Sequence, residues 1–203
     1  MGPQRPRLAA KGGGWHVGPP DDAHLHPTSD TMNRSIHLQP DELSRLVVQA
    51  ATNAQSEGFW TGEGSAAEDA ARHLVRFLGL LAGGDDDLDE RELNLFAQIY
   101  AAATGSHLPE DELRASVHES VSVADDPEQV EAFLSTTPPF LRAVITMDRA
   151  RGTRNAEQVV TAMSGLALAL LAADGKAEVE EDAVFTTHLG HLRREIGSLG
   201  SAT

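Results

Sequence analysis

The spacing of apolar residues after Pro40 is the feature that most restricts what this chain can fold into. Apolar side chains recur three or four residues apart, the period of one helix face, and no stretch alternates apolar and polar residues long enough to predict a strand. We therefore predict an all-α fold, a compact helical bundle. The segments with the helical period are 41–54, 65–82, 93–100, 113–121, 140–147, 159–173 and 185–196.

Two further helix starts are indicated by capping residues. Asp126 is followed by Pro127, at a position where a first helical turn tolerates proline, and by Gln129 at the capping-box position. Asn155 and Gln158 repeat this spacing ahead of the most apolar helix. Helices are therefore predicted to begin next to Asp126 and Asn155.

Charge and composition exclude several classes of ligand and site. The 203 residues carry 16 Lys and Arg against 31 Asp and Glu, a formal net charge of −15. This charge disfavours nucleic acid and anionic membrane surfaces, and it leaves cations and basic protein surfaces as the natural ligands. The chain has no cysteine, which excludes disulfides and thiolate metal sites and makes a cytoplasmic location the expected one.

The ends of the chain and its most apolar run lead to three expectations about organisation. Residues 1–37 are rich in Gly, Pro, Asp and His without an apolar period, so we predict a disordered arm, with Met32 as an alternative translation start. Residues 38–197 form the predicted helical domain, and 198–203 a flexible tail. The run 162–173 is shorter than the roughly 20 residues of a membrane span, so we predict no membrane insertion.

Two segments of the predicted bundle are alike. The first, 73–100, reads HLVRFLGLLAGGDDDLDERELNLFAQIY, and the second, 159–189, reads VVTAMSGLALALLAADGKAEVEEDAVFTTHL. Each has an apolar helix rich in small residues, a short acidic turn and a helix that opens with acids. We interpret them as two similar helix–acidic loop–helix units. In each unit an aspartate and a glutamate are seven residues apart, Asp85 with Glu92 and Asp174 with Glu181.

These units resemble the TerB-like family of tellurite-resistance and stress proteins, whose signature is approximately Ala-Asp-Gly followed by a helix that opens with Glu. The second unit has ADGK at 173–176 with Glu181 following, and the first matches over 84–92, with Asp86 in the place of the glycine. The likeness covers about 68–192.

The resemblance implies a non-enzymatic helical module that binds a divalent cation through its acidic interhelical loops. It also implies a role in a stress response or a multicomponent assembly, with another protein as partner. The metal ligands that it suggests are Asp85, Asp89, Glu92, Asp174 and Glu181.

By themselves, the residues of the first acidic loop support two interpretations. Hard divalent cations such as Ca²⁺ bind several carboxylate oxygens, and Asp85, Asp87 and Asp89 alternate along the turn. The loop is not an EF-hand, because Glu90 replaces the required glycine and Phe96 the final glutamate. The alternative is helix capping, in which Asp89 is the N-cap and the other acids favour the helix dipole.

The last predicted helix carries another candidate cluster. Glu181, His188, His191 and Glu195 fall along one flank of its apolar stripe. Such a flank can ligate zinc or another transition metal, but the interpretation we favour is a solvated surface. The chain lacks the Glu-x-x-His motif of helical metal enzymes and the common phosphate, dinucleotide and hydrolase motifs, so we do not predict an enzyme.

An aromatic pair interrupts the helical pattern at 58–64 (GFWTGEG). Phe59 and Trp60 beside flexible glycines can dock a partner protein. The alternative, which we favour, is a helix–helix connection whose rings cover the core.

The sequence thus predicts a cytoplasmic, non-enzymatic TerB-like module, bound to a divalent cation (Ca²⁺ or another) and to a partner protein. The first alternative is a metal-independent adaptor whose acidic surface meets a basic protein. A metal-dependent hydrolase is the third.

Overall fold

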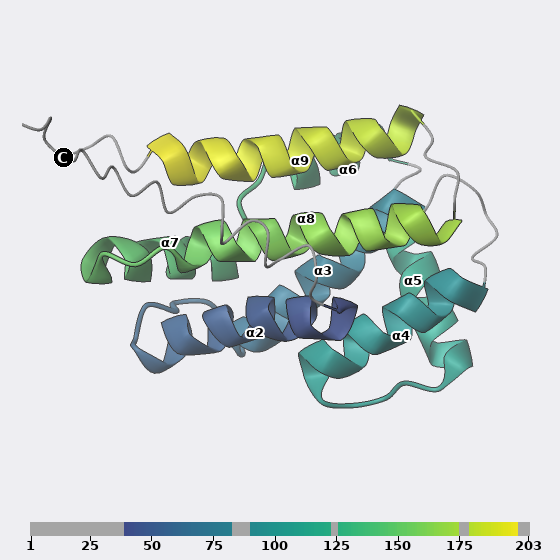
Figure 1. Cartoon of the computed structure of the whole chain (residues 1–203), viewed down its shortest axis with the longest axis horizontal. Helices are drawn as coiled ribbons and strands as arrows, with labels where there is room; N and C mark the ends of the chain where they lie inside the picture. Colours follow the sequence, from purple (N-terminus) through teal and green to yellow (C-terminus); the bar gives the residue numbers. More distant parts are fainter. Residues whose placement is uncertain (1–38, 83–89, 123–125, 175–178, 199–203) are drawn as a thin grey trace, which may run out of the picture.

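A computed structural model describes residues 39–82, 90–122, 126–174 and 179–198. Helices and their connections make up all of this part of the chain, with no strand among the described residues, which confirms the all-α prediction (Figure 1). The helices are α2 (Pro40–Ser56), α3 (Ala66–Ala82), α4 (Glu90–Thr104), α5 (Glu110–Ser122), α6 (Pro127–Leu134), α7 (Pro139–Arg151), α8 (Asn155–Asp174) and α9 (Val179–Ser198).

The predicted arm at 1–37, with Met32, lies outside the described residues. So does the predicted tail from residue 199, while Ser198 is the last residue of α9. The described helices lie between Pro40 and Ser198, and the predicted helical domain is 38–197.

Helices α2, α3 and α8 form the centre of the bundle. α2 packs against α8, α3, α4 and α7, and α3 also contacts α5 and α9. α8 lies between α2 and α9 along the length of the molecule (Figure 1). Because a central helix meets neighbours on several sides, most residues of α3 are buried. The largest fully buried side chains are Phe77, Phe96, Phe140, Leu74, Leu78, Leu81, Ile99, Leu141, Met163, Leu166, Leu189 and Leu192.

α8 is apolar enough to pass as a membrane span by length and composition alone. The window with this property is Asn155–Ala172, and half of it is buried against the rest of the protein. The central helix of a bundle meets the same criteria, since it is surrounded by other helices.

Asp126 is the N-cap of α6, as predicted, but Gln129 bonds to its side chain and does not complete a capping box. Asp126 accepts hydrogen bonds from the backbone N–H groups of Glu128, at 3.1 Å, and Gln129, at 3.3 Å. The Gln129 side chain donates to the other carboxylate oxygen of Asp126 at 2.7 Å. These bonds lower the pKa of Asp126 from its ordinary value, because they stabilise the charged carboxylate.

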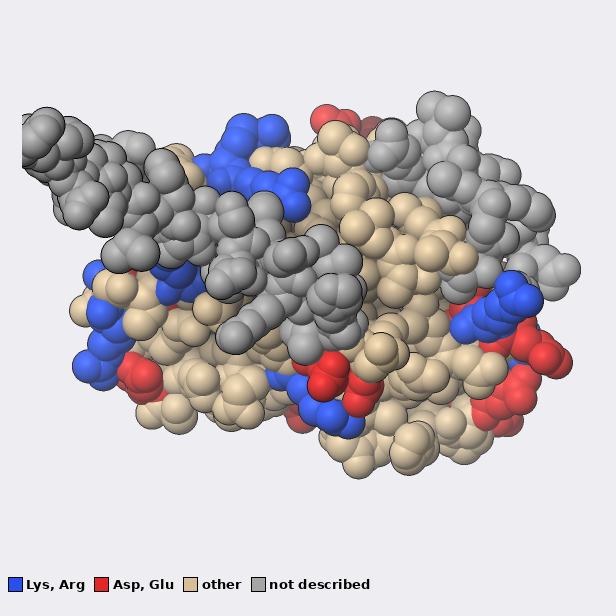
Figure 2. All heavy atoms as spheres, viewed as in Figure 1, with Lys and Arg blue, Asp and Glu red and all other residues tan. Residues whose placement is uncertain are grey.

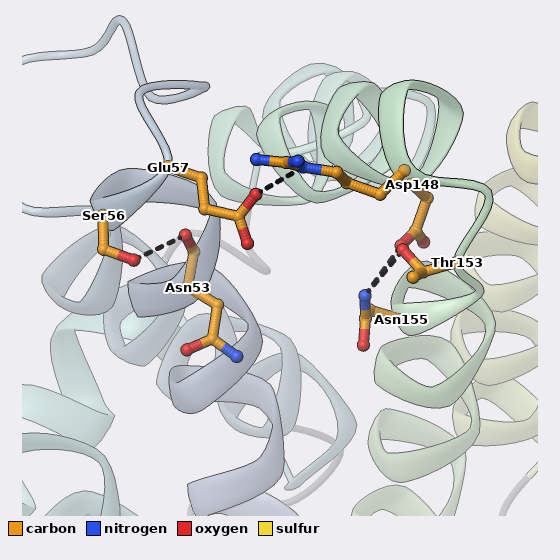
Figure 3. Close-up of polar contacts among 7 residues, drawn as sticks. Asn53, Ser56, Glu57, Asp148, Thr153 and Asn155 are labelled. Atoms are coloured by element: carbon orange, nitrogen blue, oxygen red, sulfur yellow. Dashed lines mark hydrogen bonds and ion pairs between the residues drawn. The ribbon is translucent and has the colours of Figure 1, made fainter.

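The connection from α7 to α8 is held by a buried aspartate rather than by Asn155. Asp148, in the last turn of α7, accepts hydrogen bonds from Thr153 Oγ1 and from Asn155 Nδ2 at 2.8 Å (Figure 3). It also accepts one from the backbone N–H of Ala156 at 2.7 Å. Asn155 is itself the first helical residue, so its side chain donates where the sequence pattern predicts that it accepts. Gly152 closes α7 with a φ of 68°, which favours glycine.

Candidate functional site

The predicted metal ligands lie at helix ends, and the structure describes them unequally. Glu92 is in the first turn of α4, and its side chain is 7% exposed. Asp174 is the last residue of α8 and Glu181 lies in the first turn of α9, while their side chains are outside the described part of the chain. Asp85 and Asp89 lie outside the described residues altogether.

The helix ends that carry these residues share one end of the bundle. The start of α4, the end of α8 and the start of α9 all lie at the right-hand end in Figure 1, and α8 packs against both α4 and α9. We call this region the acidic end. Its described and exposed acids are Glu90 at the start of α4 and Glu110, Asp111 and Glu112 at the start of α5, and Figure 2 shows acidic side chains gathered there.

The donor chemistry at the acidic end suits a hard cation, since carboxylate oxygens are the ligands that Ca²⁺ and Mg²⁺ prefer. Within the described ranges, no three His, Asp or Glu side chains form a group that could hold a metal ion. Glu92 is the predicted ligand whose side chain the structure describes. The side chains of the other four predicted ligands lie outside the described part of the chain.

Phe59 and Trp60 are half-buried and pack against the hydrophobic core. The Phe59 backbone N–H bonds to the Ala54 carbonyl at 2.9 Å, and Trp60 Nε1 donates to the Gly64 carbonyl at 3.1 Å. The indole ring lies so close to Gly62 that a Cβ atom there would be 2.4 Å from it. The two rings thus cover the core beside α2, in agreement with the favoured interpretation of this segment.

A second feature, which the sequence analysis does not identify, lies on the side of α3 that faces α6. It is a cleft of about 440 Å³ between α3, α6 and the start of α7, and we call it the arginine cleft. Two arginines one turn apart on α3 reach it from one side. It is lined by Asp69, Arg72, His73, Arg76, Gln129, Ala132, Phe133, Thr136, Pro138 and Pro139.

Beside the cleft, two buried histidines from distant helices meet. Nε2 of His73 in α3 lies 3.1 Å from Nε2 of His188 in α9. The other nitrogen of His188, Nδ1, lies 3.1 Å from the Leu134 carbonyl oxygen, which can only accept. In the neutral ring of His188, Nδ1 therefore carries the hydrogen and Nε2 accepts, so His73 donates through its Nε2–H.

The surroundings keep both histidines uncharged at neutral pH. Burial lowers the pKa of His73 well below its ordinary 6.5, and His188 and Arg76 lower it further. Burial also lowers the pKa of His188, and its bond to the Leu134 carbonyl opposes that shift only in part. Phe133 stacks on both rings, with centroids 4.9 Å from His73 and 5.1 Å from His188.

This arrangement corrects the interpretation of the last helix as a solvated flank. His188 is fully buried, because it faces α3 and α6 rather than solvent. His191 is half-buried, and its Nε2 lies 3.2 Å from Thr137 Oγ1. The histidine partner of His188 is thus His73, 115 positions away along the chain, and a spacing rule within one helix cannot find it.

The arginines of the cleft have a recognisable pattern in the sequence. Arg72 and Arg76 are four residues apart, so they lie on one face of α3, and Asp69 and His73 share the same spacing. The apolar period identifies the buried face of α3, so it does not identify these polar positions as a site. Comparisons with protein-family models, curated proteins and solved structures gave no match, and the TerB-like likeness stays a prediction from the sequence.

Proposed function

We propose that this chain is a non-enzymatic interaction module whose acidic end binds a divalent cation. The ligands are five of the carboxylates in the two helix–loop–helix units. The observation that supports this proposal most directly is the convergence of the two units: the start of α4, the end of α8 and the start of α9 lie at one end of the bundle (Figure 1). The proposed ligands are Asp85, Asp89, Glu92, Asp174 and Glu181.

The position of Glu92 gives further support. Glu92 lies in the first turn of α4, where the backbone N–H groups favour negative charge. A cation beside this turn would offset the repulsion among the neighbouring acids.

The biological role follows the TerB-like resemblance. A helical module that binds a divalent cation at one end can serve a stress response or a multicomponent assembly. The partner in such an assembly is another protein, which binds the acidic end when the cation is bound there.

A metal-independent adaptor is the second candidate, and the exposed acids at the starts of α4 and α5 favour it. Glu90, Glu110, Asp111 and Glu112 are all exposed, and the Glu110 carboxylate accepts hydrogen bonds from Arg114 within its own helix. Such a surface complements Lys and Arg on a partner protein. In this case the acidic end binds a basic surface directly, without a cation.

The test compares two variants that lose equal negative charge. The full chain is stripped with a chelator, and its thermal unfolding is followed in Ca²⁺, Mg²⁺, Mn²⁺ or Zn²⁺. An ion present at about one hundred times its dissociation constant stabilises the wild type by roughly 2.7 kcal/mol. Asp85→Asn with Asp174→Asn abolishes this stabilisation, whereas Glu110→Gln with Asp111→Asn retains it.

Equal responses of both variants, or no response of the wild type to any ion, would contradict the cation site. The adaptor alternative is then tested with a lysine-rich peptide in the presence of chelator. Binding that is lost in Glu110→Gln with Asp111→Asn, but kept in Asp85→Asn with Asp174→Asn, would establish the metal-independent surface.

A further inference from the structure

The arginine cleft carries positive charge that no described carboxylate neutralises. Arg72 is exposed, and neither it nor Arg76 belongs to an ion pair in the part of the chain that the structure describes. In a chain with a net charge of −15, two adjacent arginines outside any described ion pair are unexpected. The cleft is lined by these two arginines and by one carboxylate, Asp69, so its formal charge is positive.

Arg76 is positioned by its surroundings but not satisfied by them. Its guanidinium carbon lies 5.1 Å from the centroid of the Phe133 ring, a cation–π contact that orients the planar group. Its Nε atom is buried, and no described residue accepts a hydrogen bond from it. Buried N–H groups are nearly always hydrogen-bonded, so an unpartnered one beside a cleft indicates a missing acceptor.

Asp69, the one carboxylate that lines the cleft, bonds to the backbone of α7. Asp69 Oδ2 accepts the backbone N–H of Phe140 at 3.1 Å and so holds the first turn of α7 against α3. Asp69 forms no ion pair with Arg72 or Arg76. An oxyanion bound in the cleft would supply the acceptor that Arg76 Nε lacks among the described residues.

Most of the remaining wall is apolar. Phe133 and Ala132 come from α6, and Pro138 and Pro139 lie at the start of α7. The polar side chains of Gln129 and Thr136 also line the cleft, and they donate to Asp126 and to the Ala132 carbonyl. A ligand that fills the cleft therefore needs an apolar body as well as an anionic group.

We propose that the arginine cleft binds an oxyanion, a carboxylate or a phosphate, carried on an apolar or aromatic body. Arg72 and Arg76 bind the oxyanion through their guanidinium N–H groups, which match the oxygens of both anions. Phe133, Pro138 and Pro139 contact the apolar body. The inference goes beyond the proposed function and is independent of it, because it uses no residue of the acidic end.

The experiment titrates the full chain with benzoate, phenyl phosphate, inorganic phosphate and benzamide, the last being a neutral analogue of benzoate. The signals followed by NMR are those of the arginine Nε–H groups and of the backbone of α3 and α6. Benzoate or phenyl phosphate is expected to shift these signals saturably, and benzamide is not. The tighter of the two anions identifies the carboxylate or the phosphate as the oxyanion.

Arg72→Gln is the decisive variant, because Arg72 is exposed and its loss leaves the core unchanged. Its affinity for the tighter anion is expected to fall about tenfold, the effect of losing one charge-assisted hydrogen bond. Arg149→Gln is the matched control, since it removes an exposed arginine near the other end of α7, and it retains wild-type affinity.

Three results would overturn the proposal. The first is the absence of a saturable shift with either anion. The second is equal binding of benzamide, or undiminished binding by Arg72→Gln. The third is binding of inorganic phosphate as tight as that of phenyl phosphate in a protein that does not bind benzoate, because the apolar walls would then contribute nothing.

Discussion

His73 and His188 show how single side chains far apart in the sequence join three helices. Their Nε2 atoms are 3.1 Å apart, and His188 also bonds to the carbonyl oxygen of Leu134 at the end of α6. The pair therefore links α3, α9 and α6 through two hydrogen bonds, and the bond between the two rings requires a neutral His188. Protonation of His188 at Nε2 would place two N–H groups against each other and break the link.

This pair makes folding stability dependent on pH. The pKa of each histidine is lower in the folded protein than the ordinary 6.5, so the unfolded chain binds more protons below that pH. The contribution of the neutral pair to the free energy of unfolding is therefore fully present above about pH 6.5. As the pH falls below this value, the free energy of unfolding decreases by at most about 1.4 kcal/mol per pH unit for each histidine. Urea unfolding between about pH 7.5 and pH 5 measures this slope.

His188→Asn is expected to reduce this slope by about half, because one of the two shifted groups no longer titrates. The asparagine amide can still donate to the Leu134 carbonyl, which limits the structural damage. His107→Gln is the control, since His107 is exposed, and it should leave the slope unchanged. An unaltered slope in His188→Asn would show that the buried pair does not titrate as described.

The residue scale also shows where prediction from sequence stops. Asp126 was predictable as a cap, because an N-cap aspartate bonds to backbone N–H groups two and three residues ahead. Asp148 was not, because it caps α8 from within the preceding helix, across Gly152. The His73–His188 contact spans 115 positions. Such contacts depend on how helices pack, which local spacing does not encode.

At the scale of elements, the apolar period predicted every described helix except α6, which was predicted from the cap at Asp126. The period does not reveal how closely two helices approach. α2 and α8 approach closely at Gly165, where a Cβ atom would lie 2.9 Å from Cδ1 of Leu43. Leu43 is itself buried and has little room to move.

Gly165→Ala therefore tests the packing of α2 on α8. An alanine in a helix interior gains up to about 1 kcal/mol in propensity over glycine, but overpacking against a buried side chain costs about 1–3 kcal/mol. We expect a net loss of about 1 kcal/mol in the free energy of unfolding, measured with urea. The close contact at Leu43 decides the sign.

Gly190→Ala in α9 is the matched control for this substitution. The nearest atom to its Cβ would be Nη1 of Arg194 at 3.6 Å, an ordinary contact. It should therefore stabilise the protein by roughly 0.5–1 kcal/mol. If both alanines stabilise equally, α2 and α8 are not as close as the structure places them.

At the scale of the whole molecule, charge is separated between two regions. The acidic end gathers carboxylates at the starts of α4 and α5 (Figure 2), and the arginine cleft carries the cationic side of α3. The sequence predicts the acidic turn before α4, because its acids are nearly consecutive, but it does not predict that the start of α5 lies at the same end. It does not predict the second region, because the cleft exists only once α6 and the start of α7 pack against α3.

The central claim is that the two helix–loop–helix units form one cation site, and paramagnetic Mn²⁺ tests it most directly. Bound Mn²⁺ broadens the NMR signals of nearby amides, so substoichiometric Mn²⁺ added to the chelator-stripped full chain marks the site. We predict that the first turn of α4, the end of α8 and the first turn of α9 lose their signals at the same Mn²⁺ concentration. Ca²⁺ or Mg²⁺ in excess should restore them. Broadening of one unit without the other, or of exposed acids throughout the protein to the same degree, would contradict the claim.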